Sequence, residues 1–189
     1  MSDKEYPKPS LTADVVTFSL DDTGRVCVLL IQRGKDPFAG RWAVPGGFCE
    51  PSETVRESAA RELVEETGIR DLPMVELGVF SRPGRDPRGW VVSVAHVAIL
   101  PANRRGEAKG GDDARAAKFF SIGLDERGRV TLEADGEKAG PLAFDHDEIL
   151  ARAIARLEAS SDMLGPVLFG RPMSGEEAQR AVETALSRE

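Results

Sequence analysis

Cysteine is nearly absent from this chain, which limits any chemistry based on thiols. Only Cys27 and Cys49 occur among the 189 residues. The two lie in different expected elements, and their spacing matches no metal-binding or redox motif. We therefore expect two free thiols without a functional role.

Long apolar runs are also missing. No stretch approaches the roughly 20 apolar residues that a membrane-spanning helix needs. Residues 1–6 contain no apolar core of a secretory signal peptide. Together with an ordinary share of hydrophobic residues, 41%, these absences predict a cytoplasmic protein that has no membrane partner.

The chain has no excess of positive charge. Lys and Arg number 25 against 32 Asp and Glu, which gives a net charge of −7. A protein that grips a nucleic-acid backbone unaided usually carries a basic stripe, so we do not expect a nucleic-acid partner. The basic residues that could meet anions are local, at Arg82, Arg85 and Arg88, with Arg33 and Lys35 elsewhere. This distribution favours a small anionic ligand.

Apolar segments alternate with turn signals and two main helical patterns. This interleaving predicts a mixed α/β sandwich in one domain, over residues 1–170, followed by a helical extension over 171–189. Residues 101–113 form a polar loop, and 130–141 are ambiguous. Strands are expected over 11–20, 26–32, 74–81, 90–100 and 118–122, and helices over 54–66, 145–159 and 174–187.

Three carboxylates share one face of the helix expected at 54–66. Glu62, Glu65 and Glu66 are spaced i, i+3 and i+4, so their side chains lie in adjacent rows. Like charges this close raise one another's pKa, and a hard divalent cation would neutralise them. A solvated acidic face is the alternative reading of the three glutamates alone.

Residues around this helix favour the cation site. Thr54 and Glu57 form a capping box that begins the helix, and Gly68 ends it. Pro-Gly-Gly, ending at Gly47, allows the backbone to approach the carboxylates closely. Arg61 is placed to pair with Glu53 and to hold the preceding loop against the helix.

These residues together resemble the signature box of the Nudix hydrolases. The pattern is Gly47, five residues, Glu53, seven residues, and then Arg-Glu-Leu-Val-Glu-Glu-Thr-Gly-Ile over 61–69. Trp-Ala-Val-Pro-Gly-Gly over 42–47 leads into the box as it does in family members. The resemblance implies the Nudix-type α/β/α sandwich with a mixed sheet.

The resemblance also implies an activity and a ligand set. Members hydrolyse a nucleoside diphosphate linked to another moiety and use Mg²⁺ or Mn²⁺ as cofactor. By position, Glu62 and Glu66 would be the principal metal ligands, and Glu65 and the carbonyl of Gly46 would contribute. Two further residues, Arg61 and Glu53, would orient these ligands.

A general base is expected outside the box, on the loop before a late strand. Asp113 is the first choice there, and Asp112 and Glu107 lie in the same loop. Glu62 itself is the other candidate, because family members differ on this point. A solvated polar loop is the alternative for each loop residue.

The loop at 80–90 narrows the choice of substrate. It resembles a Nudix subgroup that includes ADP-ribose pyrophosphatases and the ADP-ribose-binding sensor domains of regulators of NAD metabolism. Tyr-Pro at 6–7 and Phe-Asp-His at 144–146 extend the resemblance over roughly residues 6–170. The alternatives are ion pairs that only pin the loop, and core roles for the aromatic residues. The expected substrate contacts are Arg33, Arg82, Arg85, Arg88 and Trp42.

The resemblance therefore implies hydrolysis of ADP-ribose to AMP and ribose 5-phosphate. One alternative is an enzyme that acts on oxidised nucleoside triphosphates or dinucleoside polyphosphates. Another is a non-catalytic ADP-ribose sensor, although such sensors tend to lose box glutamates. The regulators carry a winged-helix DNA-binding domain beyond this region, which we do not expect here. Relatives are often homodimers, so a homodimer is the oligomer that the resemblance implies.

Overall fold

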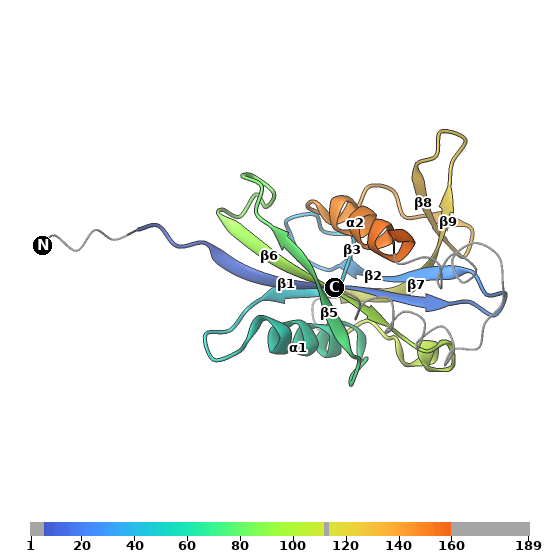
Figure 1. The fold of residues 1–189 in the computed structure, drawn as a ribbon, viewed down its shortest axis with the longest axis horizontal. Helices are drawn as coiled ribbons and strands as arrows, with labels where there is room; N and C mark the ends of the chain where they lie inside the picture. Colours follow the sequence, from blue (N-terminus) through green and yellow to red (C-terminus); the bar gives the residue numbers. More distant parts are fainter. Residues whose placement is uncertain (1–5, 112–113, 160–189) are drawn as a thin grey trace, which may run out of the picture.

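Nine strands form one sheet in the part of the chain that the structure describes, residues 6–111 and 114–159 of a computed structural model (Figure 1). The order is β5-β6-β1-β2-β7-β8-β9, and β3 and β4 pair with β2 and β1 respectively. The strands are β1 (Ser10–Leu20), β2 (Val26–Arg33), β3 (Trp42–Ala43), β4 (Gly46–Phe48), β5 (Met74–Phe80), β6 (Val91–Ile99), β7 (Ala114–Leu124), β8 (Val130–Ala134) and β9 (Glu137–Lys138).

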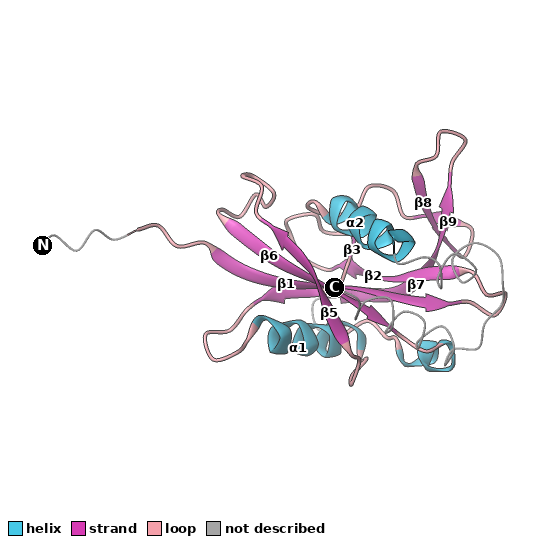
Figure 2. Cartoon of the chain, in the orientation of Figure 1, coloured by secondary structure: helices cyan, strands magenta, loops and turns pink. Residues whose placement is uncertain are grey.

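The sheet is mixed and is covered on both faces. Strands β1 and β6 run parallel, whereas β1–β2, β2–β7 and β5–β6 are antiparallel. The helices α1 (Val55–Thr67) and α2 (His146–Ala159) lie on opposite sides of the sheet (Figures 1 and 2). This arrangement confirms the expected α/β/α sandwich. None of the described helices is long and apolar enough to cross a membrane.

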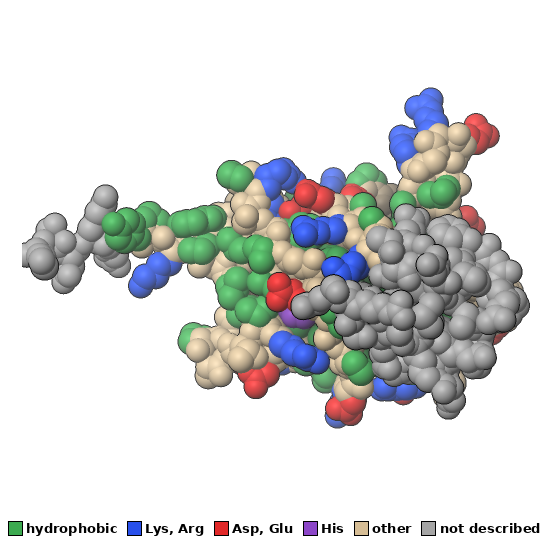
Figure 3. All heavy atoms as spheres, viewed as in Figure 1, with side chains coloured by type: hydrophobic (Ala, Val, Ile, Leu, Met, Phe, Trp, Pro, Cys, Tyr) green, Lys and Arg blue, Asp and Glu red, His purple; other side chains and the backbone are tan. Residues whose placement is uncertain are grey.

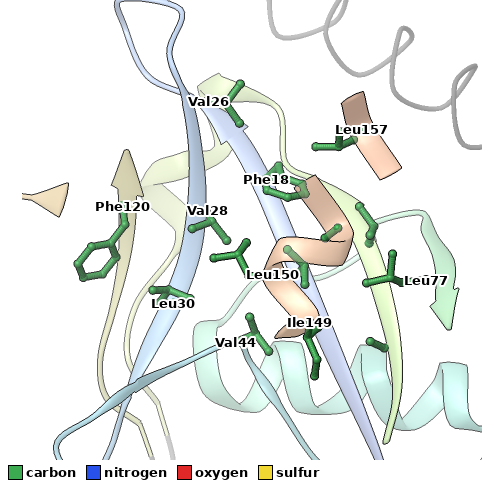
Figure 4. Packing of buried hydrophobic residues seen from close by; sticks show 14 of the residues in the cluster. Phe18, Val26, Val28, Leu30, Val44, Leu77, Phe120, Ile149, Leu150 and Leu157 are labelled. Atoms are coloured by element: carbon green, nitrogen blue, oxygen red, sulfur yellow. The ribbon is translucent and has the colours of Figure 1, made fainter. Parts of the chain in front are cut away.

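Alternating side chains of the central strands build two separate cores. On β1, Val16 and Phe18 point toward α2, while Ala13 and Val15 pack on the α1 side. Figure 4 shows the α2 side, where Ile149 and Leu150 of the helix meet β-strand side chains such as Phe18. Because both faces are covered, β1 is buried almost continuously from its third residue onward.

The helix α1 begins and ends as its sequence predicts. The Thr54 hydroxyl accepts a hydrogen bond from the backbone N–H of Glu57, and the Glu57 carboxylate accepts one from the Thr54 N–H. Gly68 ends the helix in the left-handed conformation, at φ 74°, which costs glycine little. The capping box therefore fixes where α1 begins, and with it the positions of Glu62, Glu65 and Glu66 along the helix.

The later part of the chain departs from the expected elements. Strand β7 has 11 residues rather than five because it pairs along both β2 and β8. The ambiguous segment forms the hairpin β8–β9, and residues 102–107 form the 3-10 helix η1 (Ala102–Glu107). The predicted helix at 174–187 and the boundary at 170 lie outside the described residues.

We predict that Leu150→Ala destabilises the fold by about 2–5 kcal/mol, because it leaves a cavity between α2 and the sheet. Leu150 is 2% exposed in this core. Leu124→Ala is the matched control, since that side chain is 65% exposed; its free energy of unfolding should change by less than about 0.5 kcal/mol. Urea unfolding of both variants checks this, and equal losses would contradict the packing described.

Candidate active site

The buried side of α1, which packs on the sheet, also carries a carboxylate, Glu66. Ala59 and Leu63 are fully buried against the sheet, and Val55 packs at the edge of the same core. Glu62 and Glu66 lie where α1 meets the glycine turn, which we define as residues 44–47. This turn includes the start of β4.

Glu66 is buried beneath the glycine turn. Its exposed fraction is 8%, and its Oε2 accepts a hydrogen bond of 2.9 Å from the backbone N–H of Gly46. Burial raises the pKa of Glu66 to about 8, and the nearby charges of Glu62 and Asp14 act in the same direction. The Gly46 hydrogen bond and the charge of Arg33 only partly oppose this shift. The protein thus holds an acid whose charge lacks full compensation.

Glu62 touches the same turn. A Cβ atom added to Gly47 would overlap the Glu62 carboxylate, so only glycine allows this contact. Burial raises the pKa of Glu62, while its hydrogen bond from Arg61 lowers it. Glu62 and Glu66 therefore offer carboxylate oxygens beside one glycine turn, a donor set that suits a hard cation.

Arg61 donates hydrogen bonds to three glutamates and to one backbone carbonyl around the site. Its Nε donates to Glu53 at 2.7 Å, and its Nη1 donates to Glu62 at 2.7 Å and to Glu65 at 2.9 Å. Its Nη2 donates to the carbonyl of Phe48 at 3.0 Å. The expected pair between Arg61 and Glu53 is present. One guanidinium therefore fixes the loop, the helix and the end of β4.

Glu53 is held in its charged form by this contact. The hydrogen bonds from Arg61, and then from the Ser58 hydroxyl at 2.7 Å, lower the pKa of Glu53 to about 2. Such a carboxylate is a poor proton acceptor at neutral pH, so its geometry suits orientation of Arg61. Its role as an orienting residue stays a prediction.

A preformed cluster of three ligating side chains is not found among residues 6–111 and 114–159. Glu65 explains part of this result, because its carboxylate is directed to Arg61 and its side chain is 43% exposed. The expected ligands that lie together at the glycine turn are Glu62, Glu66 and the backbone of Gly46. The contribution of Glu65 stays a prediction.

The loop expected to carry the general base is anchored to the end of α1. The N–H of Gly111 donates to the carbonyl of Glu66 at 3.2 Å, and that of Lys109 donates to Thr67 at 2.9 Å. Asp112 and Asp113 follow directly and lie outside the described residues. Glu107 instead pairs with Arg104 at 2.8 Å.

The arginine loop, residues 80–90, contains three differently placed arginines. Arg85 is 6% exposed and forms a two-pronged ion pair with Asp145, at 2.8 and 2.5 Å. Arg88 pairs with Asp86 and stacks over the Phe48 ring at 4.6 Å. Arg82 is 61% exposed and lies 3.6 Å from Glu148. Asp145 directly precedes α2, and its carboxylate accepts both hydrogen bonds from Arg85.

The two remaining residues expected to contact the substrate are Arg33 and Trp42. Arg33 stacks over the Phe144 ring at 4.8 Å and is close enough to Glu66 to lower the pKa of that residue. Trp42 packs edge-on against Phe120 at 4.7 Å, at the border of the α2-side core. On the face shown in Figure 3, Lys and Arg side chains are interspersed with Asp and Glu.

Sequence reasoning missed a buried polar group behind the turn. Asp14 is 4% exposed and accepts a hydrogen bond from the Ser93 hydroxyl. His146 accepts a hydrogen bond of 3.1 Å from the N–H of Val44 at its Nδ1. A lone aspartate inside the apolar run at 13–16 was the available signal for this group.

Comparison with known proteins gives a consistent picture. The family model described as NUDIX domain matches residues 10–143. An ADP-ribose pyrophosphatase from Methanocaldococcus jannaschii is 42% identical over 65% of this chain and 63% of its own. The ADPR responsive transcriptional repressor NtrR from Acinetobacter baylyi is 33% identical over 81% of this chain and 56% of its own. The chain thus spans about six tenths of the length of these relatives.

Solved structures agree with the sequence relatives. A MutT/nudix family protein from Enterococcus faecalis superposes with a TM-score of 0.77 at 34% identity, covering 98% of this chain and 76% of that one. The NUDIX domain of Shewanella oneidensis NrtR, solved in complex with ADP ribose, superposes with a TM-score of 0.62 at 27% identity. That match covers 83% of this chain and 94% of the other.

We predict that Glu66→Gln removes the stabilisation of this protein by Mg²⁺ or Mn²⁺. Glutamine can still accept from the Gly46 N–H, but it carries no charge for a cation. Because burial raises the pKa of Glu66 to about 8, the variant should melt at or above the wild-type temperature in EDTA. A ligand at 100 times its Kd stabilises the native state by about 2.7 kcal/mol, and thermal unfolding with and without metal measures this.

Glu126→Gln is the control for that experiment, because Glu126 is an exposed loop residue. It should keep the full metal-dependent rise in melting temperature. If Glu66→Gln keeps the same rise, Glu66 is not a metal ligand.

Proposed function

This chain belongs to the NUDIX domain family, and from that premise we propose that it hydrolyses a nucleoside diphosphate linked to another moiety, using Mg²⁺ or Mn²⁺. The observation that carries the proposal is the contact of Glu62 and the buried Glu66 with the glycine turn. ADP-ribose is the substrate that we propose first, with AMP and ribose 5-phosphate as products.

The oxygen donors beside the turn fit the cation. We assign Glu62 and Glu66 as its principal ligands, with the carbonyl of Gly46 and with Glu65 contributing. A divalent cation there would neutralise pyrophosphate charge, lower the pKa of water and stabilise the leaving phosphate. The raised pKa of Glu66 supports this assignment, because a bound cation is what would keep a buried carboxylate ionised.

The protein's own residues prepare this chemistry. Arg61 keeps the Glu62 carboxylate in place through its Nη1 and fixes Phe48 through its Nη2. The attacking water must lose a proton, and Asp113 remains our first choice to accept it, ahead of Asp112 and Glu107. Glu62 is the second choice, since Arg61 is already bonded to one of its oxygens.

The arginine loop supports an anionic substrate that extends beyond the metal. Arg88 stacks on Phe48, the residue that follows the glycine turn, and its side chain is 37% exposed. We therefore assign Arg88 and Arg33 as the principal substrate contacts, with Arg82 and Trp42 at the margin. We assign Arg85 an indirect role, because its guanidinium is buried against Asp145.

A non-catalytic ADP-ribose sensor is the second candidate. The similarity to a repressor from Acinetobacter baylyi favours it. The retained glutamates Glu62, Glu65 and Glu66 argue for catalysis instead, since a binding module needs no complete set of metal ligands.

We predict that the purified protein with Mg²⁺ releases AMP from ADP-ribose faster than it hydrolyses oxidised nucleoside triphosphates or dinucleoside polyphosphates. A substrate panel in ¹⁸O-labelled water, with product mass spectrometry, measures the preference and the phosphorus attacked. Faster turnover of either alternative class would overturn the substrate assignment. Tight binding of ADP-ribose without any turnover would support the sensor.

We predict that Arg88→Lys raises KM for ADP-ribose by about tenfold or more while kcat changes less. Lysine keeps the charge but loses both the planar stack on Phe48 and the forked donors. Arg82→Lys is the matched control in the same loop, and its KM should change by less than about threefold because the side chain lies mostly in solvent. Steady-state kinetics of both variants checks this, and a larger effect at Arg82 would reverse the assignment.

A further inference from the structure

Side chains from both helical layers hold the glycine turn. The N–H of Val44 donates to Nδ1 of His146 at 3.1 Å, and the N–H of Gly46 donates to Glu66 at 2.9 Å. His146 begins α2 and Glu66 lies on α1, on opposite sides of the sheet (Figure 1). Pro45 between them has no N–H, and its carbonyl accepts from Val15 at 2.8 Å. The turn is therefore fixed from α1, from α2 and from β1.

His146 has the protonation state that this contact needs. It is 5% exposed, and burial, followed by the charge of Arg85, lowers its pKa to about 3. A neutral imidazole has one N–H. Because Nδ1 accepts from Val44, the proton resides on Nε2, which faces Oδ1 of Asp14 at 3.9 Å. The ring is thus a fixed acceptor for the turn.

Asp14 connects this ring with the proposed metal ligands. The Ser93 hydroxyl donates to its Oδ2, which leaves Oδ1 toward His146. A Cβ atom added to Gly46 would overlap the Asp14 carboxylate. Asp14 also pairs with Gly46 in the β1–β4 ladder. The carboxylate therefore lies between the histidine ring and the turn.

The buried ion pair between Arg85 and Asp145 fixes the position of His146. Arg85 and Asp145 have side chains that are 3% and 2% exposed, and Asp145 directly precedes His146. A buried ion pair is weak evidence for stability, because desolvation offsets much of its attraction. Its value here is geometric, since it joins the arginine loop to Asp145, the residue directly before α2.

We propose that His146 is a positioning residue for hydrolysis, which sets the glycine turn for the divalent cation by accepting the Val44 N–H. This inference rests on the proposed function. His146 contacts neither the cation nor the substrate in this account. It acts through the backbone of residues 44–46, whose carbonyl at Gly46 is an assigned ligand.

The test compares His146→Asn with His146→Gln. Both place the same amide in the same site, but the Asn oxygen falls near the position of Nδ1, and the Gln amide reaches the position of Nε2. His146→Asn should bind Mn²⁺ with the affinity of the wild type, and His146→Gln about tenfold more weakly, as is typical when a group supporting a metal ligand is lost. Electron paramagnetic resonance of free Mn²⁺ gives both dissociation constants without any turnover.

Leu150→Ala shows whether a general loss of packing explains the effect. Leu150 lies one turn further along α2, in the apolar core. This variant should lose stability and keep its Mn²⁺ affinity. Equal affinities for the Asn and Gln variants would overturn the proposal, as would equal weakening by Leu150→Ala.

Ser93→Ala serves if either histidine variant fails to fold. It keeps His146 and removes the donor that orients Asp14, so we expect Mn²⁺ binding to weaken by about threefold; unchanged affinity would then overturn the proposal. The failure of the proposed function has a different signature. In that case the wild type binds Mn²⁺ with the expected dependence on His146 and hydrolyses no substrate of the panel.

Discussion

The burial of the Glu66 carboxylate under a glycine turn is the interaction on which the rest of the site depends. Its oxygen satisfies the Gly46 N–H, but burial and two neighbouring acids disfavour its charge. The charge of Arg33 and the Gly46 hydrogen bond oppose this effect only in part. The fold thus keeps an ionisable group in a place where a divalent cation, rather than a side chain, is suited to stabilise it.

The surrounding architecture follows from this constraint. Arg61 donates to Glu53, Glu62 and Glu65, so it orients two of the proposed ligands. The capping box and Gly68 fix the length and phase of α1, and Leu63 fixes its rotation against the sheet. From the other layer, His146 fixes the opposite end of the same turn. The helices α1 and α2 cover opposite faces of the sheet, yet a side chain from each one contacts residues 44–46.

Local rules explain how much of this could be predicted from the sequence. The capping box, the i, i+3, i+4 glutamates and the Arg61–Glu53 pair depend on residues within one helix and its preceding loop, and all are present as expected. The length of β7 and the hairpin β8–β9 were not predicted, because pairing between distant strands decided them. The contacts of Asp14 with Ser93, 79 positions away, and of Val44 with His146, 102 positions away, carry no local signal.

The arginine loop shows the same limit for substrate recognition. Three arginines at three-residue spacing suggest equivalent phosphate contacts, yet Arg85 is buried in an ion pair with Asp145 and Arg82 lies in solvent. Burial and partner choice depend on where α2 begins, which the loop sequence does not encode.

The central claim is that the cation binds between Glu62, Glu66 and the glycine turn. Crystals grown with Mn²⁺ and a non-hydrolysable ADP-ribose analogue, measured near the manganese absorption edge, test it most directly. We expect an anomalous difference peak within coordination distance of both carboxylates and of the Gly46 carbonyl. A peak bound elsewhere, or ordered analogue without any peak at this turn, would contradict it.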